Sequence, residues 1–281
     1  MRLFFTQLSW EFRKLWSRPR TYLGFVGCLA WHLIASSLLR IPAIRLHIQR
    51  DLWKMKWDFE QTFSGLTTAT HLMGEAVTAI GTLALALVTT DLIAKEMEDG
   101  TLQTTFCRPV SRSRVLFLKL IVGLSYSALL VLFIATSSLA VGLIFEGRGP
   151  LIMVALHEGV LGTFDFQTGL ARYALATGLL TISAATGVLI TFACSCFPMR
   201  PVTAAAIALA IFFADNSIRA APGMSQVAPY CLTTRVIAWR QVFNQEVPDL
   251  MLRRCYRDLL LIDAGLLALA WWAFRRREFK P

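Results

Sequence analysis

Three carboxylates in or beside long apolar runs are the residues of this 281-residue chain best suited to ion or proton chemistry. Glu75 and Asp91 flank the run at about 72–94, and Asp263 lies inside the run at about 259–274. Because a charge that faces lipid is costly, such residues usually face other helices or water and often mark a transport path. All three carboxylates are therefore candidate intramembrane polar sites. The alternative for Glu75 and Asp91 is that they lie at the two membrane interfaces.

Motifs for other chemistry are missing from the sequence. No Lys follows a Gly, which excludes the phosphate-binding pattern G-x-x-x-x-G-K-[ST]. His157-Glu158 lacks the second His of a zinc-protease helix, and no G-x-S-x-G occurs. The six cysteines form no C-x-x-C; Cys231 and Cys255 share one polar segment and could be either a disulfide or two free thiols. We therefore expect no catalytic residue, no metal site and no cofactor held by this chain.

The composition predicts an integral membrane protein. Hydrophobic residues make up 56% and charged residues 16%, whereas a soluble domain usually has about a quarter of its residues charged. Several apolar runs reach the roughly 20 residues that span a bilayer as a helix. The net charge of +10 does not call for nucleic acid as a partner, because Lys and Arg normally gather beside membrane helices, close to lipid headgroups.

The predicted fold is all-α, with six transmembrane helices in one membrane domain over 1–281. No internal repeat or low-complexity linker divides the chain. The short fifth and sixth runs could also be broken or re-entrant. The six predicted spans are about 21–39, 72–94, 115–145, 173–197, 202–218 and 259–274.

Amphipathic or polar segments surround these spans. Residues 1–20 carry apolar side chains on one helical face and polar ones on the other, a pattern typical of a helix lying in the membrane interface. Residues 41–70 predict a second amphipathic helix, since Ile44, Ile48, Leu52, Met55, Phe59 and Phe63 recur every three or four positions. The stretch 151–171 is expected to be a loop with an apolar middle, and 219–257 a longer polar segment before the last span.

Basic residues set the expected topology. Six spans place both termini on one side, and Arg13, Lys14, Arg18 and Arg20 precede the first span while Arg275–Arg277 follow the last. The total difference in Lys and Arg between the two sides is slight, but this concentration at the ends predicts cytoplasmic termini. A multi-pass protein of a bacterial inner or plasma membrane fits this pattern.

The charged stretch 95–114, "KEMEDGTLQTTFCRPVSRSR", then lies in the cytoplasm between spans two and three. Gly100-Thr101 permits a turn and a new helix start, and Arg108-Pro109 ends that helix because a helical residue is disfavoured before Pro. The positions of Arg112, Arg114 and Lys119 predict that they sit at the inner membrane surface. A short rigid helix here would transmit motion between the spans; a plain basic loop is the alternative.

This stretch, extended to Lys119, closely resembles the cytoplasmic segment of ABC-2-type transporter permeases. In those proteins an acidic-Gly-Thr-Leu stretch precedes Pro-Val-Ser-Arg and a Lys in the next helix. The architecture also agrees with that of these permeases. The chain has a basic-Pro-basic entry at Arg18-Pro19-Arg20, six predicted spans and a terminal "FRRREF". The chain is also similar to permeases encoded with maturation factors of the copper enzyme of nitrous oxide reduction, although no Met- or His-rich track is visible.

The resemblance implies a permease that pairs with a second permease copy or paralogue and with two cytoplasmic ABC ATPase subunits, which bind ATP and Mg. It implies re-entrant half-helices before the last span, and a coupling segment between spans two and three that docks in the ATPase. The residues expected to form or shape this coupling segment are Glu96, Glu98, Gly100, Thr101, Leu102, Phe106, Arg108, Pro109 and Arg112.

We therefore expect this chain to be the transmembrane part of an ATP-driven exporter and to have no enzymatic activity of its own. Two alternatives stay open. An ATP-driven permease could act mechanically on an extracytoplasmic partner, for example in metalloenzyme maturation, through 41–70 or 219–257. A gradient-driven secondary transporter could use Glu75, Asp91 and Asp263, although such proteins commonly show inverted repeats.

Overall fold

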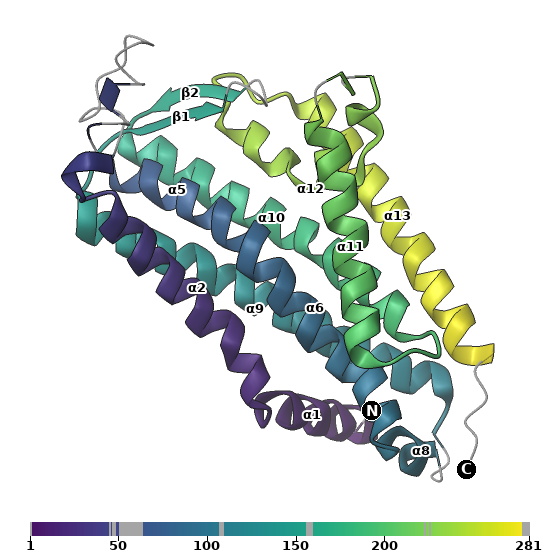
Figure 1. Cartoon of the computed structure of the whole chain (residues 1–281). Helices are drawn as coiled ribbons and strands as arrows, with labels where there is room; N and C mark the ends of the chain where they lie inside the picture. Colours follow the sequence, from purple (N-terminus) through teal and green to yellow (C-terminus); the bar gives the residue numbers. More distant parts are fainter. Residues whose placement is uncertain are drawn as a thin grey trace.

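The computed structural model describes residues 2–44, 46, 49–50, 64–106, 110–155, 160–221, 223–224 and 226–276, with the backbone alone for residues 2, 103, 105, 106 and 155. The predicted second amphipathic helix at 41–70 lies mostly outside these residues. Long helices running between the two ends of the molecule dominate the described part (Figure 1).

Five helices of the described chain are long and apolar enough to cross a membrane. They correspond to the first five predicted spans, which are therefore confirmed as span-length helices. Their bounds are α2 (Pro19–Leu38), a continuous helix from Gly65 to Glu98, α9 (Arg112–Glu146), α10 (Phe166–Ser195) and α11 (Pro201–Ala220).

The Gly65–Glu98 helix changes its winding twice. Ser64 caps its start by accepting the backbone N–H of Thr67 at 3.2 Å. It continues as α5 (Gly65–Ala76), a π-helical turn η1 (Val77–Gly81), α6 (Thr82–Thr90), a second π-helical turn η2 (Asp91–Lys95) and α7 (Glu96–Glu98). Single π-turns inside helices are frequent at functional sites, because the wider turn redirects the side chains that follow it.

The remaining segments differ from the predictions in two respects. The expected loop at 151–171 contains an antiparallel hairpin, β1 (Leu151–Ala155) and β2 (Val160–Phe164), paired from Leu151–Phe164 to Ala155–Val160. The predicted sixth span lies within α13 (Asp249–Arg276), which starts earlier than expected and is not among the five span-length apolar helices. Charged residues along α13, among them Arg257, Asp258 and Asp263, reduce its apolar character.

The described residues between α11 and α13 form short helices. The described part of 219–257 holds η4 (Ala228–Tyr230), α12 (Leu232–Val236) and η5 (Ala238–Phe243). The Asp215 carboxylate, near the end of α11, fixes the start of α12 by accepting the backbone N–H groups of Leu232 at 3.1 Å and Thr233 at 2.6 Å. Cys231 and Cys255 in this region are both free thiols.

The core lies where α5 and α6, α9 and α10 pack together, with α2 on one side and α11 and α13 on the other (Figure 1). Tyr126 of α9 is fully buried and donates its hydroxyl to the Thr21 carbonyl at 3.1 Å. Glycines let α5 and α9 meet closely, since a Cβ at Gly142 would lie 3.1 Å from the Ala69 backbone nitrogen.

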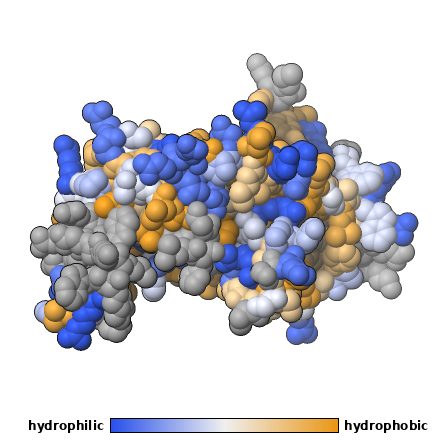
Figure 2. All heavy atoms as spheres, turned by 90° about the horizontal axis from the view of Figure 1, so that it is seen from above, coloured by the Kyte–Doolittle hydropathy of each residue, from blue (hydrophilic) through white to orange (hydrophobic). Residues whose placement is uncertain are grey.

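The two ends of the molecule differ in their elements. The hairpin, α12 and the start of α13 lie at one end, while α1 (Arg2–Trp16), α8 (Thr101–Phe106) and the end of α13 lie at the other (Figure 1). Seen from above, the hairpin end carries hydrophilic residues interspersed with apolar ones (Figure 2). α1 and α8 lie across the ends of the long helices, where they can connect the spans to one another.

Candidate functional site

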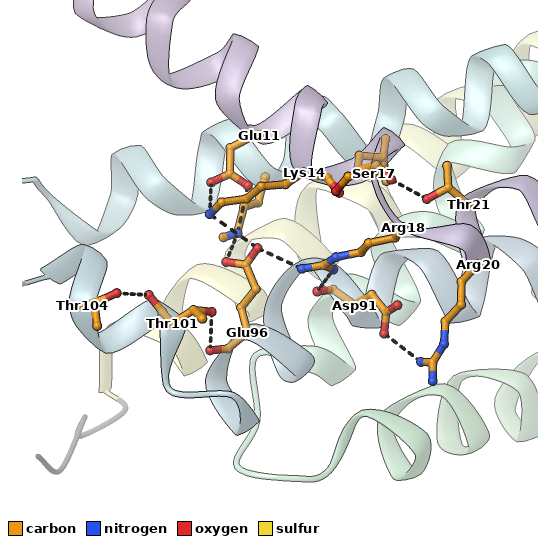
Figure 3. Close-up of polar contacts among 12 residues, drawn as sticks. Glu11, Lys14, Ser17, Arg18, Arg20, Thr21, Asp91, Glu96, Thr101 and Thr104 are labelled. Carbon is orange, nitrogen blue, oxygen red and sulfur yellow. Dashed lines mark hydrogen bonds and ion pairs between the residues drawn. The ribbon is translucent and has the colours of Figure 1, made fainter.

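Seven charged side chains meet at the end of the molecule that carries α1 and α8 (Figure 3). They come from four segments: α1, the link into α2, the end of the Gly65–Glu98 helix, and α9. We refer to them as the charge cluster, which consists of Glu11, Lys14, Arg18, Arg20, Asp91, Glu96 and Lys119.

Glu96 and Lys119 form the centre of the charge cluster. The Lys119 ammonium lies 2.7 Å from Glu96 Oε2, and the two side chains are only 1% and 4% exposed. Lys119 follows Val115, Leu116 and Leu118 on an apolar helix, so its ammonium has to find an anion inside the protein. Lys119, which was predicted to sit at the inner membrane surface, is buried within the protein against Glu96.

α1 supplies the second carboxylate of this centre. Glu11 Oε2 lies 3.1 Å from the Lys119 ammonium, while Glu11 Oε1 lies 3.4 Å from the more exposed ammonium of Lys14. Lys14 also lies 3.8 Å from Glu96 Oε1. Because Lys119 is shared between Glu11 and Glu96, α1 is tied to both the second and the third span.

Two arginines next to Pro19 complete the charge cluster. Arg18 reaches Glu96 Oε1 at 3.3 Å and donates to the Asp91 carbonyl at 2.7 Å, so one guanidinium spans the π-helical turn η2. Arg20 pairs with Asp91 Oδ1 at 3.4 Å, although half of its own side chain is exposed. Pro19 at the first turn of α2 fixes the direction of the chain between these arginines.

The residues after Glu96 form a short turn and helix anchored to the charge cluster. Gly100 has φ +71°, a conformation that glycine adopts readily, and it separates α7 from α8. Thr101 donates its hydroxyl to the Glu96 carbonyl at 3.1 Å, and Leu102 is fully buried in the core. Glu98, Thr101 and Thr104 remain exposed. One face of the segment is thus fixed to the spans while the other is available.

A comparison with known families matches residues 47–221 to the model described as "ABC-2 family transporter protein". The match covers more than half of the chain and includes the segment between spans two and three. The chain belongs to the ABC-2 transporter family. It is accordingly an integral membrane protein and a permease of an ABC-type system. A comparison with curated proteins found no matching sequence.

Within this ABC-2 transporter, the predicted coupling residues lie in different environments. Glu96 and Leu102 are buried and hold the segment in place, whereas Glu98 and Thr101 are exposed and Gly100 makes the turn. Arg112 begins α9 some distance along the chain and donates to the Arg275 carbonyl at 3.0 Å. Arg108, Pro109 and the side chain of Phe106 lie outside the described residues.

The three candidate intramembrane carboxylates do not form a single site. Asp91 belongs to the charge cluster, at the end of the molecule that carries α1. Glu75 is exposed on α5, and Asp263 is buried on α13, where its Oδ1 has no hydrogen-bond partner among the described residues. The structure therefore brings Asp91 together with basic residues of the N-terminal segment and leaves the other two apart.

Sequence analysis missed Lys14, Arg18 and Lys119 as partners of Glu96, and Glu11 as the second carboxylate beside Lys119. A lone Lys within "VLFLKLIVGL" was the available signal, because a buried ammonium implies a carboxylate nearby. The identity of that carboxylate could not be deduced, since Glu11 and Glu96 lie 108 and 23 positions from Lys119.

The pH dependence of α1 docking follows from the pKa of Glu11. Burial raises the pKa of this carboxyl, but the charges of Lys119 and Lys14 outweigh burial, and the net pKa lies below the ordinary value of 4.5. A lowered pKa stabilises the folded protein above the unfolded pKa, and this contribution is lost as the pH falls through the folded value.

We therefore expect the melting temperature of the wild-type protein in detergent to fall as the pH drops below about 4.5. Glu11→Gln should melt earlier at neutral pH and show a smaller decrease on acidification, because its side chain does not titrate. Measuring melting temperature between pH 7 and pH 3.5 for both proteins provides the test. Equal decreases in the two proteins would show that Glu11 does not contribute.

Proposed function

We propose that this ABC-2 transporter is the transmembrane subunit of an ATP-driven exporter, and that the exposed face of residues 96–106 docks a separate cytoplasmic ABC ATPase. We call residues 96–106 the docking segment. The observation that carries the proposal is its two-sided environment: Glu96 and Leu102 are buried in the permease, while Glu98, Thr101 and Thr104 are exposed beside them.

Such an arrangement suits the transmission of force. Force applied at Glu98 or Thr104 would be transmitted through only a few residues to Glu96. The Glu96 carboxylate in turn forms ion pairs with Lys119 on α9 and with Arg18 before α2. Movement of the ATPase would then shift the second span, the third span and α1 together. ATP can bias the permease only if the ATPase contacts this segment differently in two states.

The remaining parts of the proposal follow the family and the geometry. The docking segment faces the cytoplasm of a bacterial inner or plasma membrane, and α1 and the end of α13 lie at the same end (Figure 1). α13 serves as the sixth span. ATP and Mg are bound by the ATPase subunits, and this chain contributes no catalytic residue.

The proposed assembly contains a second permease. Only 28% of the apolar stretch of α2 and 22% of that of α11 are buried within this chain. The rest of their apolar surface can face lipid or another subunit. Export is the proposed direction of transport.

The test is co-purification of the cognate ATPase with variants of the docking segment. Glu98→Arg should reduce the ATPase recovered by about tenfold, because it reverses a charge on the exposed face without disturbing the charge cluster. Arg148→Glu, an exposed reversal in the Gly147–Pro150 loop at the opposite end, is the matched control and should recover the wild-type amount. Unchanged recovery with Glu98→Arg in a correctly folded permease would count against docking here.

A further inference from the structure

A cavity inside the membrane region is not used by the charge cluster or by the docking segment. It lies among α5 and α6, α10, α11 and the α12–η5 turns, and its volume is about 170 Å³.

The cavity is elongated along the helices. Its lining on the second span extends from Gly74 to Ala86, and on α10 from Leu180 to Thr191. At 1.5 Å per residue, Gly74 to Ala86 corresponds to about 18 Å. The hydrocarbon core of a bilayer is about 30 Å thick, so the cavity reaches across about one leaflet. This is the depth occupied by a single acyl chain.

The body of the cavity is suited to an apolar occupant. Leu85, Ile190 and Leu209 line it, and the hydroxyls of Thr78, Thr82 and Thr191 are bonded to carbonyls of their own helices. Thr78 donates to the Gly74 carbonyl at 2.8 Å and Thr191 to the Gly187 carbonyl at 3.0 Å. The side chains of these three threonines therefore present mainly methyl groups to the cavity, and an alkyl chain beside them would leave none of the three hydroxyls without a partner.

The end of the cavity nearer the hairpin is cationic. Arg219 and Arg240 are the ionisable residues among the described lining. Arg240 stacks over the Trp239 ring at 5.5 Å from the centroid, and Arg219 donates to Asn216 at 3.2 Å. The nearby Asp215 carboxylate is occupied by three donors at the start of α12, while Glu75, exposed and outside the lining, interacts electrostatically with Arg240. A guanidinium offers five N–H donors, a pattern that matches carboxylate or phosphate.

We propose that this cavity binds an anionic amphiphile, with one acyl chain lying along α6 and α10 and its carboxylate or phosphate group between Arg219 and Arg240. The ligand could be a membrane phospholipid or a free fatty-acid-like molecule, since both present the same chemistry. The inference concerns binding by the permease alone, so it does not depend on the proposed ATPase docking.

The test uses purified permease and 11-(dansylamino)undecanoic acid, a fluorescent fatty acid, without ATPase or ATP. We expect saturable binding with enhanced dansyl emission. Arg219→Gln and Arg240→Gln should each weaken affinity for the acid by about tenfold or more, and should leave affinity for its uncharged methyl ester nearly unchanged. Arg253→Gln, an exposed change on α13, is the matched control and should bind both probes like the wild type.

A second pair of variants tests the position of the acyl chain. A Cβ at Gly187 or at Gly178, both on α10, meets no neighbouring atom within 4 Å, but only Gly187 is among the residues that line the cavity. Gly187→Phe should abolish binding of both probes, while Gly178→Phe should not. Binding unaffected by Gly187→Phe would overturn the site, and equal loss of acid and ester in the arginine variants would overturn the anionic class.

Extraction of the purified protein with organic solvent, followed by mass spectrometry, separates the two sources of ligand. A stoichiometric phospholipid retained by the wild type and lost in Gly187→Phe would identify the membrane as the source. A protein that purifies empty and binds the added acid would identify a free amphiphile. An empty protein that does not bind the added acid would contradict the proposal.

Discussion

Replacing Lys119 by Met is expected to lower the free energy of unfolding by about 3–5 kcal/mol. Glu96 is 3% exposed, and its closest partner is the Lys119 ammonium at 2.7 Å. Removing the ammonium leaves two carboxylates, Glu11 and Glu96, close together with less compensating charge. Breaking one side of a buried ion pair is strongly destabilising because the remaining charge stays desolvated. Unfolding in mixed detergent micelles, followed by tryptophan fluorescence, measures the loss.

A double-mutant cycle distinguishes this effect from simple loss of packing. Glu96→Gln combined with Lys119→Met removes both charges, and we expect the double variant to be more stable than the sum of the two single losses predicts. The same cycle between Lys119 and the exposed Glu98 should be additive. Additivity between Glu96 and Lys119 would mean that the two side chains are not energetically coupled and that the charge cluster does not hold α9 to the docking segment.

Gly142→Val is expected to destabilise the protein by about 3 kcal/mol or to prevent folding, because it forces apart two helices that meet backbone to backbone. A Cβ at Gly142 would contact the Gly65 carbonyl oxygen and lie 3.1 Å from the Ala69 nitrogen. Neither neighbour is a flexible side chain that can move aside. The same close approach allows Gly65 to donate its N–H to the Gly147 carbonyl at 3.1 Å.

Gly178→Val is the matched control for this prediction. Gly178 also lies in a long helix, but a Cβ there meets no atom within 4 Å. We expect only a small change in the melting temperature of this variant, while Gly142→Val should reduce the yield of monodisperse protein in size-exclusion chromatography. Similar behaviour of the two variants would show that the α5–α9 contact tolerates separation.

The membrane architecture could be predicted largely from the sequence, because a bilayer imposes a length and a composition on every helix that crosses it. The first five apolar runs are helices of span length, and α1 has the predicted helical conformation. The hairpin was missed because its strands are short and lie within a stretch whose sequence is also typical of a loop with an apolar middle. α13 was only partly predicted, since its first half carries charges that conceal a continuous helix.

The charge cluster was less predictable than the spans. Glu96 was chosen from its motif, but a motif does not show whether a carboxylate faces outward or is buried. Its burial depends on Lys119 and Glu11, which long stretches of chain separate from each other and which only the packing of α1 against α9 brings together. The cavity among α6, α10 and α11 was also not predictable, because it depends on the angle at which these helices separate.

The most direct test of the central claim, that the docking segment holds the ATPase, is site-specific photo-crosslinking. The crosslinking amino acid p-benzoylphenylalanine would replace Glu98 or Thr104 on the exposed face of the docking segment, and Arg148 at the opposite end as the control. The account predicts a covalent product with the cognate ATPase from positions 98 and 104 and none from position 148. Failure of both positions to crosslink in an assembly that still contains the ATPase would contradict it.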